Sequence, residues 1–466
     1  MTEYRDKYQR EYVPDSTPGS IKGGYEVTVK DLEETNAKFH SLSWPRLTIC
    51  LIVEAIALGS LSMPASMATL GLVPGVILTI FMGFLATYCS LNVGEVKFRY
   101  PEVMDYPGIG KLMFGKAGYV YFAVSFVLLL TLTTASHVLT SVIAFNVLST
   151  NAICSIVFSM IGAVLLYILA LPTNFHDMSI LGYVDCLSIS VAILITMVAT
   201  GIEATKQPGG MGATTWHAFR PADEQPTFAE AFLAVTNIAF AYAFAQCLPS
   251  MSSQLKHPAE YKKALWTLGL TEIFLYTTIG AVIYVFVGND VKSPSLLSAS
   301  PMVQKVAFGV ALPVIFISGS INTTTAALYI HEKIYSSGIH RLDAARRTKK
   351  SYAMWLFIVL FLTLIAWVVA QSIPSFGGIL GLISALFISC FSIWAPGLMW
   401  FMLLKDERPW YQGSNLFWSF LNGGAIVLGA ILLVCGVYAS AEDLMATFAK
   451  GVGAPWSCTA NQAAFH

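Results

Sequence analysis

The chain of 466 residues is 56% hydrophobic and only 12% charged, with a mean hydropathy of +0.65. A soluble domain carries about 25% charged residues, so this chain has too little polar surface to coat a water-soluble particle and must be solvated by lipid. The formal net charge is zero and there is no basic domain, so the sequence gives no support to a nucleic-acid partner.

The first 45 residues are polar, rich in charge, and contain no apolar core. They are therefore predicted to form a disordered cytoplasmic tail, and they do not fit a signal peptide. A membrane-spanning helix needs about 20 apolar residues. Eleven segments of residues 46–440 meet this length: 46–70, 72–95, 118–148, 152–171, 178–201, 228–255, 263–288, 302–332, 352–371, 375–402 and 415–439. The predicted fold class is an all-α membrane protein of about 11 transmembrane helices.

The positions of the cations predict the orientation in the membrane. With the N-terminus inside, all but five of the 27 Lys and Arg residues fall in the tail and in the cytoplasmic connections. The five on the outer side are Lys206, Arg220, Lys292, Lys305 and Lys450. Because positive residues stay inside, the N-terminus is predicted to be cytoplasmic, and residues 441–466 to form a short extracellular tail.

A weak internal repeat relates helices one to five (46–201) to helices six to ten (228–402), and leaves 415–439 as an extra helix. Each half begins with an interrupted helix, around Leu58–Pro64 in the first and Ala243–Pro249 in the second. Five is an odd number, so the two copies must enter the membrane from opposite sides. This 5+5 inverted repeat is typical of secondary transporters.

Unwound backbone survives in a bilayer only around a cavity or a ligand. The half-helix near Pro64 would direct free amides at a carboxylate, and carbonyls near Ala241–Phe244 would suit an ammonium group. Together they predict a zwitterion site. The alternative interpretation is that each Gly or Pro only kinks an ordinary helix.

Helices three and eight are expected to supply the other walls. Thr131, Thr134 and His137 share a face of helix three, and Ser318, Asn322 and Thr325 share a face of helix eight. Such side chains also serve as hydrogen-bonded packing between helices, and that alternative stays open for each one.

Three ionisable residues fall well inside the predicted helices: Glu54, Asp185 and Glu272. A buried charge in a bilayer is costly, so such groups face cavities or stay protonated. Glu54, close to the first break, is the preferred proton carrier and Asp185 the second. The alternative for each is a buried acid paired with a neighbouring helix.

No metal or cofactor is expected, since no Cys/His cluster has zinc spacing and no phosphate-binding loop occurs. Enzyme motifs are also missing, so the chain is not expected to be an enzyme. Seven of the eight cysteines, Cys154 among them, lie in predicted apolar segments and are expected to be small hydrophobic residues; only Cys458 lies in a tail. No disulfide framework is predicted.

The two breaks and their flanks, Glu54–Pro64 and Ala239–Pro249, resemble the amino acid/auxin permease family within the amino acid–polyamine–organocation group. The similarity extends over about residues 44–440, and in particular to fungal neutral amino acid permeases of the methyltryptophan-resistance type. It implies the leucine-transporter fold. It also implies a substrate site at Leu58, Gly59, Ser60, Leu61, Ser62, Ala241, Tyr242, Ala243, Phe244 and Ala245, and places Ser318, Asn322 and Thr323 near the coupling-ion site of sodium-driven relatives. Thr134 is added to the substrate site, and Glu54 and Asp185 to the coupling-ion site, from their positions within the predicted helices.

Two departures from the family pattern bear on the coupling ion. The first break keeps a single glycine, Gly59, and carries an acid, Glu54, near a position where sodium-coupled members have Asn. The sequence therefore predicts a proton-coupled symporter of neutral aliphatic and aromatic amino acids, in the plasma membrane or the vacuolar membrane. Sodium coupling, another organic solute and a nutrient-sensing receptor remain alternatives. Oligomeric state is not predicted.

Overall fold

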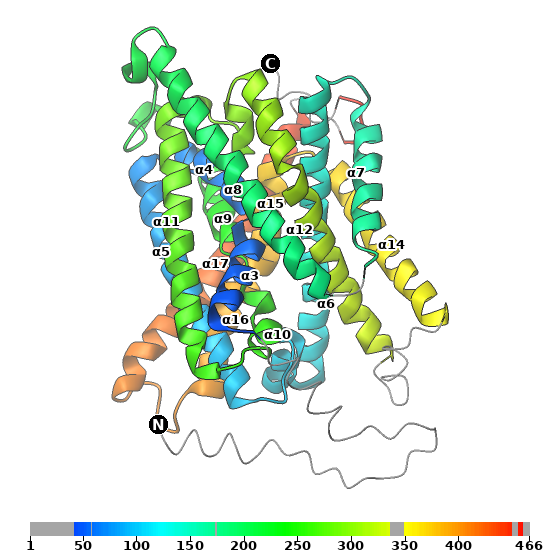
Figure 1. The fold of residues 1–466 in the computed structure, drawn as a ribbon. Helices are drawn as coiled ribbons and strands as arrows, with labels where there is room; N and C mark the ends of the chain where they lie inside the picture. Colours follow the sequence, from blue (N-terminus) through cyan, green and yellow to red (C-terminus); the bar gives the residue numbers. More distant parts are fainter. Residues whose placement is uncertain (1–41, 57, 173–174, 336–348, 450–454, 460–466) are drawn as a thin grey trace. The chain divides into compact units, whose positions relative to one another are not determined.

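The computed structural model describes residues 42–56, 58–172, 175–335, 349–449 and 455–459. The predicted tail, residues 1–45, falls almost wholly outside these ranges. The described part is a bundle of long helices, and nine of them are long and apolar enough to cross a membrane (Figure 1). The first and fourth predicted spans contain shorter apolar helices, Trp44–Val53 and Ser155–Leu169.

The first half of the chain follows the predicted order, beginning with a helix in two pieces. Its elements are α3 (Trp44–Ile56), the 3₁₀ turn η1 (Gly59–Ser62), α4 (Met63–Leu70), α5 (Leu72–Arg99), α6 (Tyr106–Ser149), α7 (Ser155–Leu169) and α8 (Phe175–Lys206). The interruption ends at Pro64, which lies in the first turn of α4, where a missing N–H leaves no bond unmade.

Helix α6 begins twelve residues earlier than the sequence analysis places it. Asp105 caps its start, with Oδ1 accepting from the amide of Gly108 at 2.7 Å, and Pro107 lies in the first turn. The helix then kinks at Phe114 and Gly115, where Gly115 takes a φ of +62°. The predicted connection 96–117 therefore contains a short helix, because capping and not hydropathy starts it.

The second half repeats the arrangement, again with a divided first helix. Its elements are α9 (Phe228–Ala241), η4 (Ala245–Cys247), α10 (Leu248–Ser252), α11 (Tyr261–Val287), α12 (Pro301–Tyr335) and α14 (Lys349–Ser372). The tenth span combines α15 (Phe376–Ile383), η8 (Ser384–Trp394), α16 (Ala395–Met399) and η9 (Trp400–Leu404), and α17 (Ser414–Ala449) follows outside the repeat. The stretches η8 and η9 are π-helical, which the sequence analysis does not foresee.

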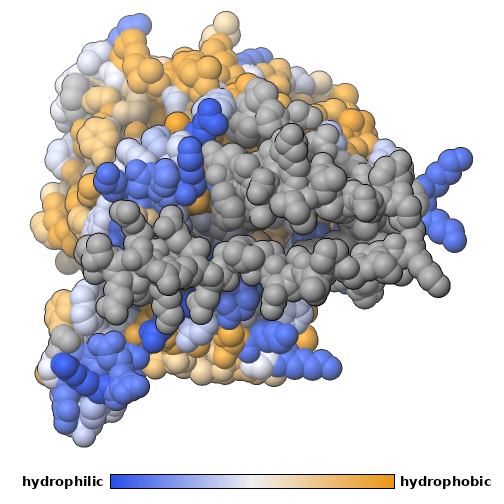
Figure 2. Space-filling view, turned by 60° about the horizontal axis from the view of Figure 1, so that its bottom comes forward, coloured by the Kyte–Doolittle hydropathy of each residue, from blue (hydrophilic) through white to orange (hydrophobic). Residues whose placement is uncertain are grey.

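The outer surface carries many large apolar side chains, including Phe274, Met302, Phe420 and Val434. Figure 2 shows wide apolar areas on the face that it displays. Small polar side chains are buried instead. This inverts the pattern of a water-soluble protein and agrees with solvation by lipid.

A short backbone pairing joins the start of the first divided helix to the end of the second. Leu42 donates its amide to the carbonyl of Gln254 at 3.0 Å, and its carbonyl accepts from the amide of Lys256 at 2.8 Å. The residues just before α3 are thereby tied to the segment that follows α10.

Candidate functional site

The first break is stabilised locally by its own serines. Ser60 donates its hydroxyl to the carbonyl of Ile56 at 2.7 Å, and Ser62 to that of Gly59 at 2.8 Å. Ile56 is the last residue of α3 and Gly59 is the first of η1, so both hydroxyls bond carbonyls at the interruption. The two serines therefore add side-chain hydrogen bonds where the helix is divided.

The second break is braced from a neighbouring helix. The amides of Tyr242 and Ala243 make only short-range bonds, to Ala239 and Phe240 at 3.2 and 3.1 Å. The hydroxyl of Tyr242 reaches across to α5 and donates to the carbonyl of Thr79 at 2.8 Å. The tyrosine thus anchors the unwound stretch to helix two.

The two breaks touch one another. A Cβ placed on Gly59 would lie 2.6 Å from the Cα of Ala241, where real Cβ atoms are essentially never found. Only glycine allows α9 to approach the first break this closely. The two predicted substrate-binding segments are therefore in direct contact.

A small cavity of about 30 Å³ lies beside this contact. Its lining residues are Ala55, Leu58, Gly59, Leu129, Thr133, His137, Phe240, Ala243, Gln246, Ser318 and Asn322. None of these side chains is an acid, Lys or Arg. The volume is that of about one water molecule, so an amino acid could enter only if the surrounding helices moved apart.

Several residues singled out from the sequence line this cavity: Leu58, Gly59, Ala243, His137, Ser318 and Asn322. Ser60, Leu61, Ser62, Ala241, Tyr242, Phe244 and Ala245 are buried around it without lining it. Thr134 also lies outside the lining, because its Oγ1 is 3.0 Å from that of Thr323 and 3.3 Å from the carbonyl of Gly319. This pair holds α6 against α12.

The sequence analysis missed other lining residues, among them Leu129, Thr133, Phe240 and Gln246. Leu129, Thr133 and His137 follow a spacing of four, which defines a face of α6 next to the expected one. Gln246 lies inside the second break and bonds the carbonyl of Ala243 at 3.1 Å. The sequence could have indicated Gln246 as a lining residue, because it is a polar residue inside the predicted second break.

Three acids were singled out, and the structure separates them. The backbone of Glu54 belongs to α3, but its side chain lies outside the described residues. Asp185 on α8 is fully buried, and its two oxygens lie 3.1 and 3.0 Å from the Ser318 hydroxyl, which donates to them. Asp185 is thus joined to a cavity-lining residue. Glu272 is also fully buried, on α11.

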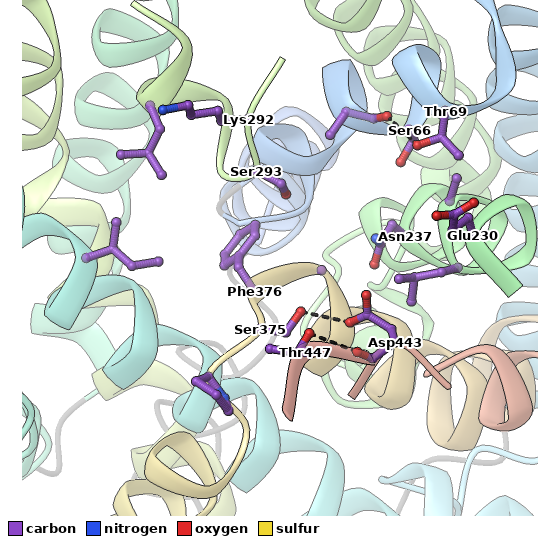
Figure 3. Close-up of a pocket in the computed structure, with 17 residues that line it drawn as sticks. Ser66, Thr69, Glu230, Asn237, Lys292, Ser293, Ser375, Phe376, Asp443 and Thr447 are labelled. Carbon is purple, nitrogen blue, oxygen red and sulfur yellow. Dashed lines mark hydrogen bonds between the residues drawn. The ribbon is translucent and has the colours of Figure 1, made fainter. Parts of the chain in front are cut away.

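A larger cavity of about 600 Å³ is lined by residues of α4 and α9, the helices that adjoin the two breaks (Figure 3). Ser66 and Thr69 line it from α4, and Asn237 lines it from α9. On α17, the carboxylate of Asp443 accepts from the hydroxyl of Ser375 at 2.9 Å. One piece of each divided helix, α4 of the first and α9 of the second, thus contributes to the wall of this cavity.

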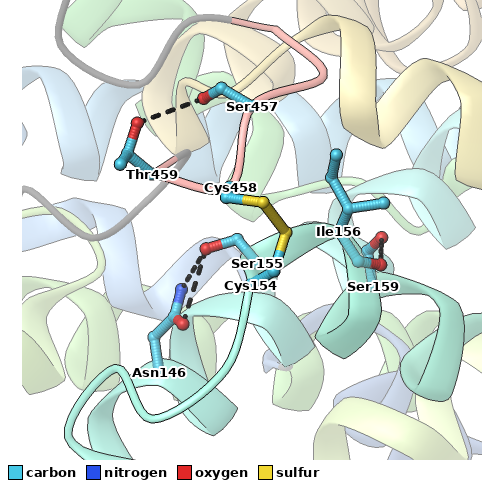
Figure 4. Close-up of a disulfide and its surroundings, with 8 residues drawn as sticks. All are labelled: Asn146, Cys154, Ser155, Ile156, Ser159, Ser457, Cys458 and Thr459. Atoms are coloured by element: carbon cyan, nitrogen blue, oxygen red, sulfur yellow. Dashed lines mark hydrogen bonds between the residues drawn. A yellow bond between two sulfur atoms is a disulfide. The ribbon is translucent and has the colours of Figure 1, made fainter.

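A disulfide corrects the expectation for the cysteines. Cys154 precedes α7 and is bonded to Cys458, 304 residues later in the chain (Figure 4). The adjacent Ser155 donates its amide to the carbonyl of Cys458 at 3.1 Å. The prediction that Cys154 is a small hydrophobic residue inside a span is wrong, because α7 begins one residue after it.

Within the described residues, no group of three or more His, Cys, Asp or Glu side chains could hold a metal ion. The site is instead a contact of two helix breaks, flanked by neutral polar groups and one buried acid.

Comparison with known proteins identifies the family. The sequence model of the transmembrane amino acid transporter proteins matches residues 40–442. The chain belongs to this family. It is therefore an amino acid transporter and a multi-pass integral membrane protein, as the resemblance to the permease family implies.

Relatives of this amino acid transporter cover nearly its whole length. The "N amino acid transport system protein" of Neurospora crassa is 45% identical over 441 residues, 94% of this chain and 93% of the relative. An "Amino acid transporter AVT1I" of Arabidopsis thaliana is 24% identical, covering 83% of this chain and 92% of the relative.

Solved structures show the fold of this transporter. Mhp1, a nucleobase-cation-symport-1 family transporter in a closed conformation with bromovinylhydantoin bound, matches with a TM-score of 0.56 at 13% identity, covering 92% of this chain and 98% of that one. A Na⁺-coupled sialic acid symporter matches with a TM-score of 0.52 at 12% identity, covering 88% and 92%. The leucine-transporter fold expected from the sequence is confirmed.

Proposed function

We propose that this transporter carries neutral aliphatic and aromatic amino acids by symport with protons. The observation behind the substrate class is the cavity at the two breaks, whose lining has no charged side chain. A zwitterion brings its own two charges, and unwound backbone and helix ends can neutralise both. The side chain would then face Ala55, Leu58, Leu129 and Phe240, which are apolar.

The polar lining residues fit the same class of substrate. Thr133, His137, Gln246 and Asn322 offer neutral donors and acceptors. The Nδ1 atom of His137 is buried and has no hydrogen-bond partner among the described residues. A lysine or glutamate side chain would have to leave a charge unpaired here, which is costly.

Proton coupling is supported by the contact between Asp185 and Ser318. In sodium-driven members the hydroxyl of helix eight would be needed as an ion ligand, but here it donates to a carboxylate. A carboxyl next to the cavity can take up a proton on one side of the membrane and release it on the other. Glu54 stays the first candidate for the proton carrier that the sequence suggests, and Asp185 is the second.

The orientation and the motion follow from the same features. Disulfides persist in oxidising compartments, so the Cys154–Cys458 bond supports an extracellular C-terminal tail and a cytoplasmic N-terminus in the plasma membrane. We define the moving bundle as helices one, two, six and seven: α3–η1–α4, α5, α9–η4–α10 and α11. Rocking of this bundle against the rest would widen the cavity and admit the substrate.

The decisive experiment uses the full chain reconstituted in vesicles with an imposed gradient of either protons or sodium. We expect accumulation of labelled leucine and tryptophan under the proton gradient alone, and none of lysine or glutamate. Accumulation only under the sodium gradient would contradict proton coupling. Binding without any flux would point to a receptor, and uptake of a different organic solute would refute the substrate class.

Two variants test the carriers in the same vesicles. Glu54→Gln and Asp185→Asn each replace an acid by a neutral amide of the same shape. We expect either change to abolish accumulation driven by pH while exchange of amino acid across the membrane persists. If accumulation persists unchanged in one variant, that acid is not the carrier.

A further inference from the structure

Glu272 is a buried acid that has no role in the mechanism proposed above. It lies in the middle of α11, its side chain is 0% exposed, and neither carboxylate oxygen has a hydrogen-bond partner among the described residues. Asp185, by contrast, receives a hydroxyl bond. An ionised carboxylate without a partner is very unfavourable in a dry site, so the closed packing around Glu272 favours a neutral acid.

The packing of α11 places Glu272 at the level of the first break. Toward the inner side, the hydroxyl of Thr48 on α3 donates to the carbonyl of Ala264 at 3.3 Å. Toward the outer side, a Cβ on Gly280 would lie 2.6 Å from the side chain of Met67 on α4. Glu272 lies about two turns from each of these contacts, where α3 gives way to η1.

A chain of aromatic contacts leads from Glu272 to the second break. Tyr276 is one turn further along α11, on the same face. Its ring meets that of Tyr242 edge to face, with centroids 5.2 Å apart, and Tyr242 belongs to the unwound stretch of helix six. The hydroxyl of Tyr276 is buried and, like Glu272, has no partner among the described residues.

The surroundings of Glu272 hold no counter-charge that the structure describes. The titratable side chains facing it are Tyr276 on α11 and Tyr242 in the unwound stretch between α9 and η4. Helix α4 has no ionisable residue, and the charged residues of α5 begin at Glu95, about 18 Å beyond the Gly83 level at which α5 packs on α11. On α3, the side chain of Glu54 is outside the described residues.

Two further elements complete this environment. On α8, Asp185 is engaged by Ser318 of α12, and Glu203 accepts from the amide of Ser300 at 3.1 and 3.2 Å near the outer end of the helix. On α3, Arg46 lies in the first turn, about three turns before the break. Each of these groups is accounted for elsewhere or is distant along its helix.

We propose that Glu272 is a proton-binding site inside the moving bundle, occupied when the breaks pack closed and emptied when water enters beside α11. The step forms an O–H bond from a carboxylate and a proton of the water phase, and the same bond breaks when the bundle opens on the other side. No electrons are transferred. The neutral acid permits tight packing around both breaks, whereas the carboxylate requires hydration, so proton occupancy is linked to conformation.

This inference rests on the proposed symport and adds one proton site to it. The test measures the number of protons moved per amino acid in vesicles containing the full chain, with labelled leucine as substrate. Glu272→Gln keeps the shape but cannot ionise, and Glu95→Gln is the matched control, because Glu95 is exposed near the end of α5. We expect the ratio to fall by one in E272Q and to stay unchanged in E95Q.

The outcomes separate the two proposals. If the wild-type chain moves leucine with no protons, the proposed symport fails. If the wild type moves protons and E272Q keeps the same ratio and the same dependence on pH, the symport stands and the role of Glu272 is refuted.

A second variant distinguishes a proton site from a structural acid. Glu272→Met replaces the acid by an apolar chain of similar length. Because Glu272 makes no hydrogen bond to a described group, we expect a melting temperature equal to or above that of the wild type, with the same loss of one proton. A large fall in melting temperature would show that the acid holds the bundle together, which would overturn the proposal.

Discussion

The contact between the two breaks makes a sharp prediction for Gly59→Ala. The added Cβ would lie 2.6 Å from Cα, 3.1 Å from Cβ and 3.3 Å from N of Ala241. Carbon atoms pack at about 3.5–4.0 Å, so the nearest pair overlaps by roughly 1 Å. These neighbours include two backbone atoms, which cannot rotate away. The overlap can be relieved only by moving helix six away from helix one.

Overpacking of this kind costs about 1–3 kcal/mol. If the cost falls on the closed state needed for transport, uptake should drop by roughly five- to one-hundred-fold. The assay is initial uptake of labelled leucine at equal protein level, with the melting temperature measured in parallel. Gly182→Ala is the matched control, because its Cβ would meet Val53 of α3 at an ordinary 3.4 Å.

The control should keep uptake within about twofold of the wild type. Equal uptake by Gly59→Ala and by Gly182→Ala would refute the reasoning, since it would show that the breaks do not need to meet at this distance.

Three further predictions follow from individual contacts. Asp185→Asn should remove the dependence of leucine accumulation on an imposed pH gradient, and a steady-state level that still follows the gradient would contradict its role. Cys458→Ser should leave a free thiol at Cys154 that a membrane-impermeant maleimide labels from outside intact cells; labelling only after the membrane is permeabilised would reverse the proposed orientation. Tyr242→Phe loses a bond to the carbonyl of Thr79, worth about 1 kcal/mol, and should lower the melting temperature by a few degrees with protein folded; an unchanged melting temperature would show that the bond does not brace the break.

Hydropathy located the helices well because lipid imposes one simple requirement on them. Every span must be apolar and must satisfy its own backbone, so α5, α12 and α17 could be placed to within a few turns. The start of α6 could not be found this way. Its first turns lie in polar sequence at the membrane boundary, where a cap at Asp105 decides the helix start.

The breaks could be predicted from Gly and Pro, but the faces of the surrounding helices could not. On α6 one face passes through Thr134 and His137, and the next passes through Thr133 and His137; hydroxyl spacing alone does not choose between them. The choice is made by α12, where Thr323 takes Thr134 as its partner. Packing between distant helices therefore set the lining of the cavity.

The disulfide was out of reach for the same reason. Cys154 and Cys458 are 304 residues apart, and the sequence around either residue does not indicate which cysteine it pairs with. Whether a buried acid such as Glu272 finds a hydrogen-bond partner likewise depends on how the helices pack in the folded bundle. The sequence could show that an acid lies within a span, but not whether a neighbouring helix offers it a bond.

The backbone pairing at Leu42 has a mechanical consequence. Two hydrogen bonds join the chain just before α3 to the segment just after α10. Helices α3 and α10, one piece of each divided helix, are therefore attached to each other at this point. A displacement of Leu42 is transmitted both to α3 and to the segment after α10.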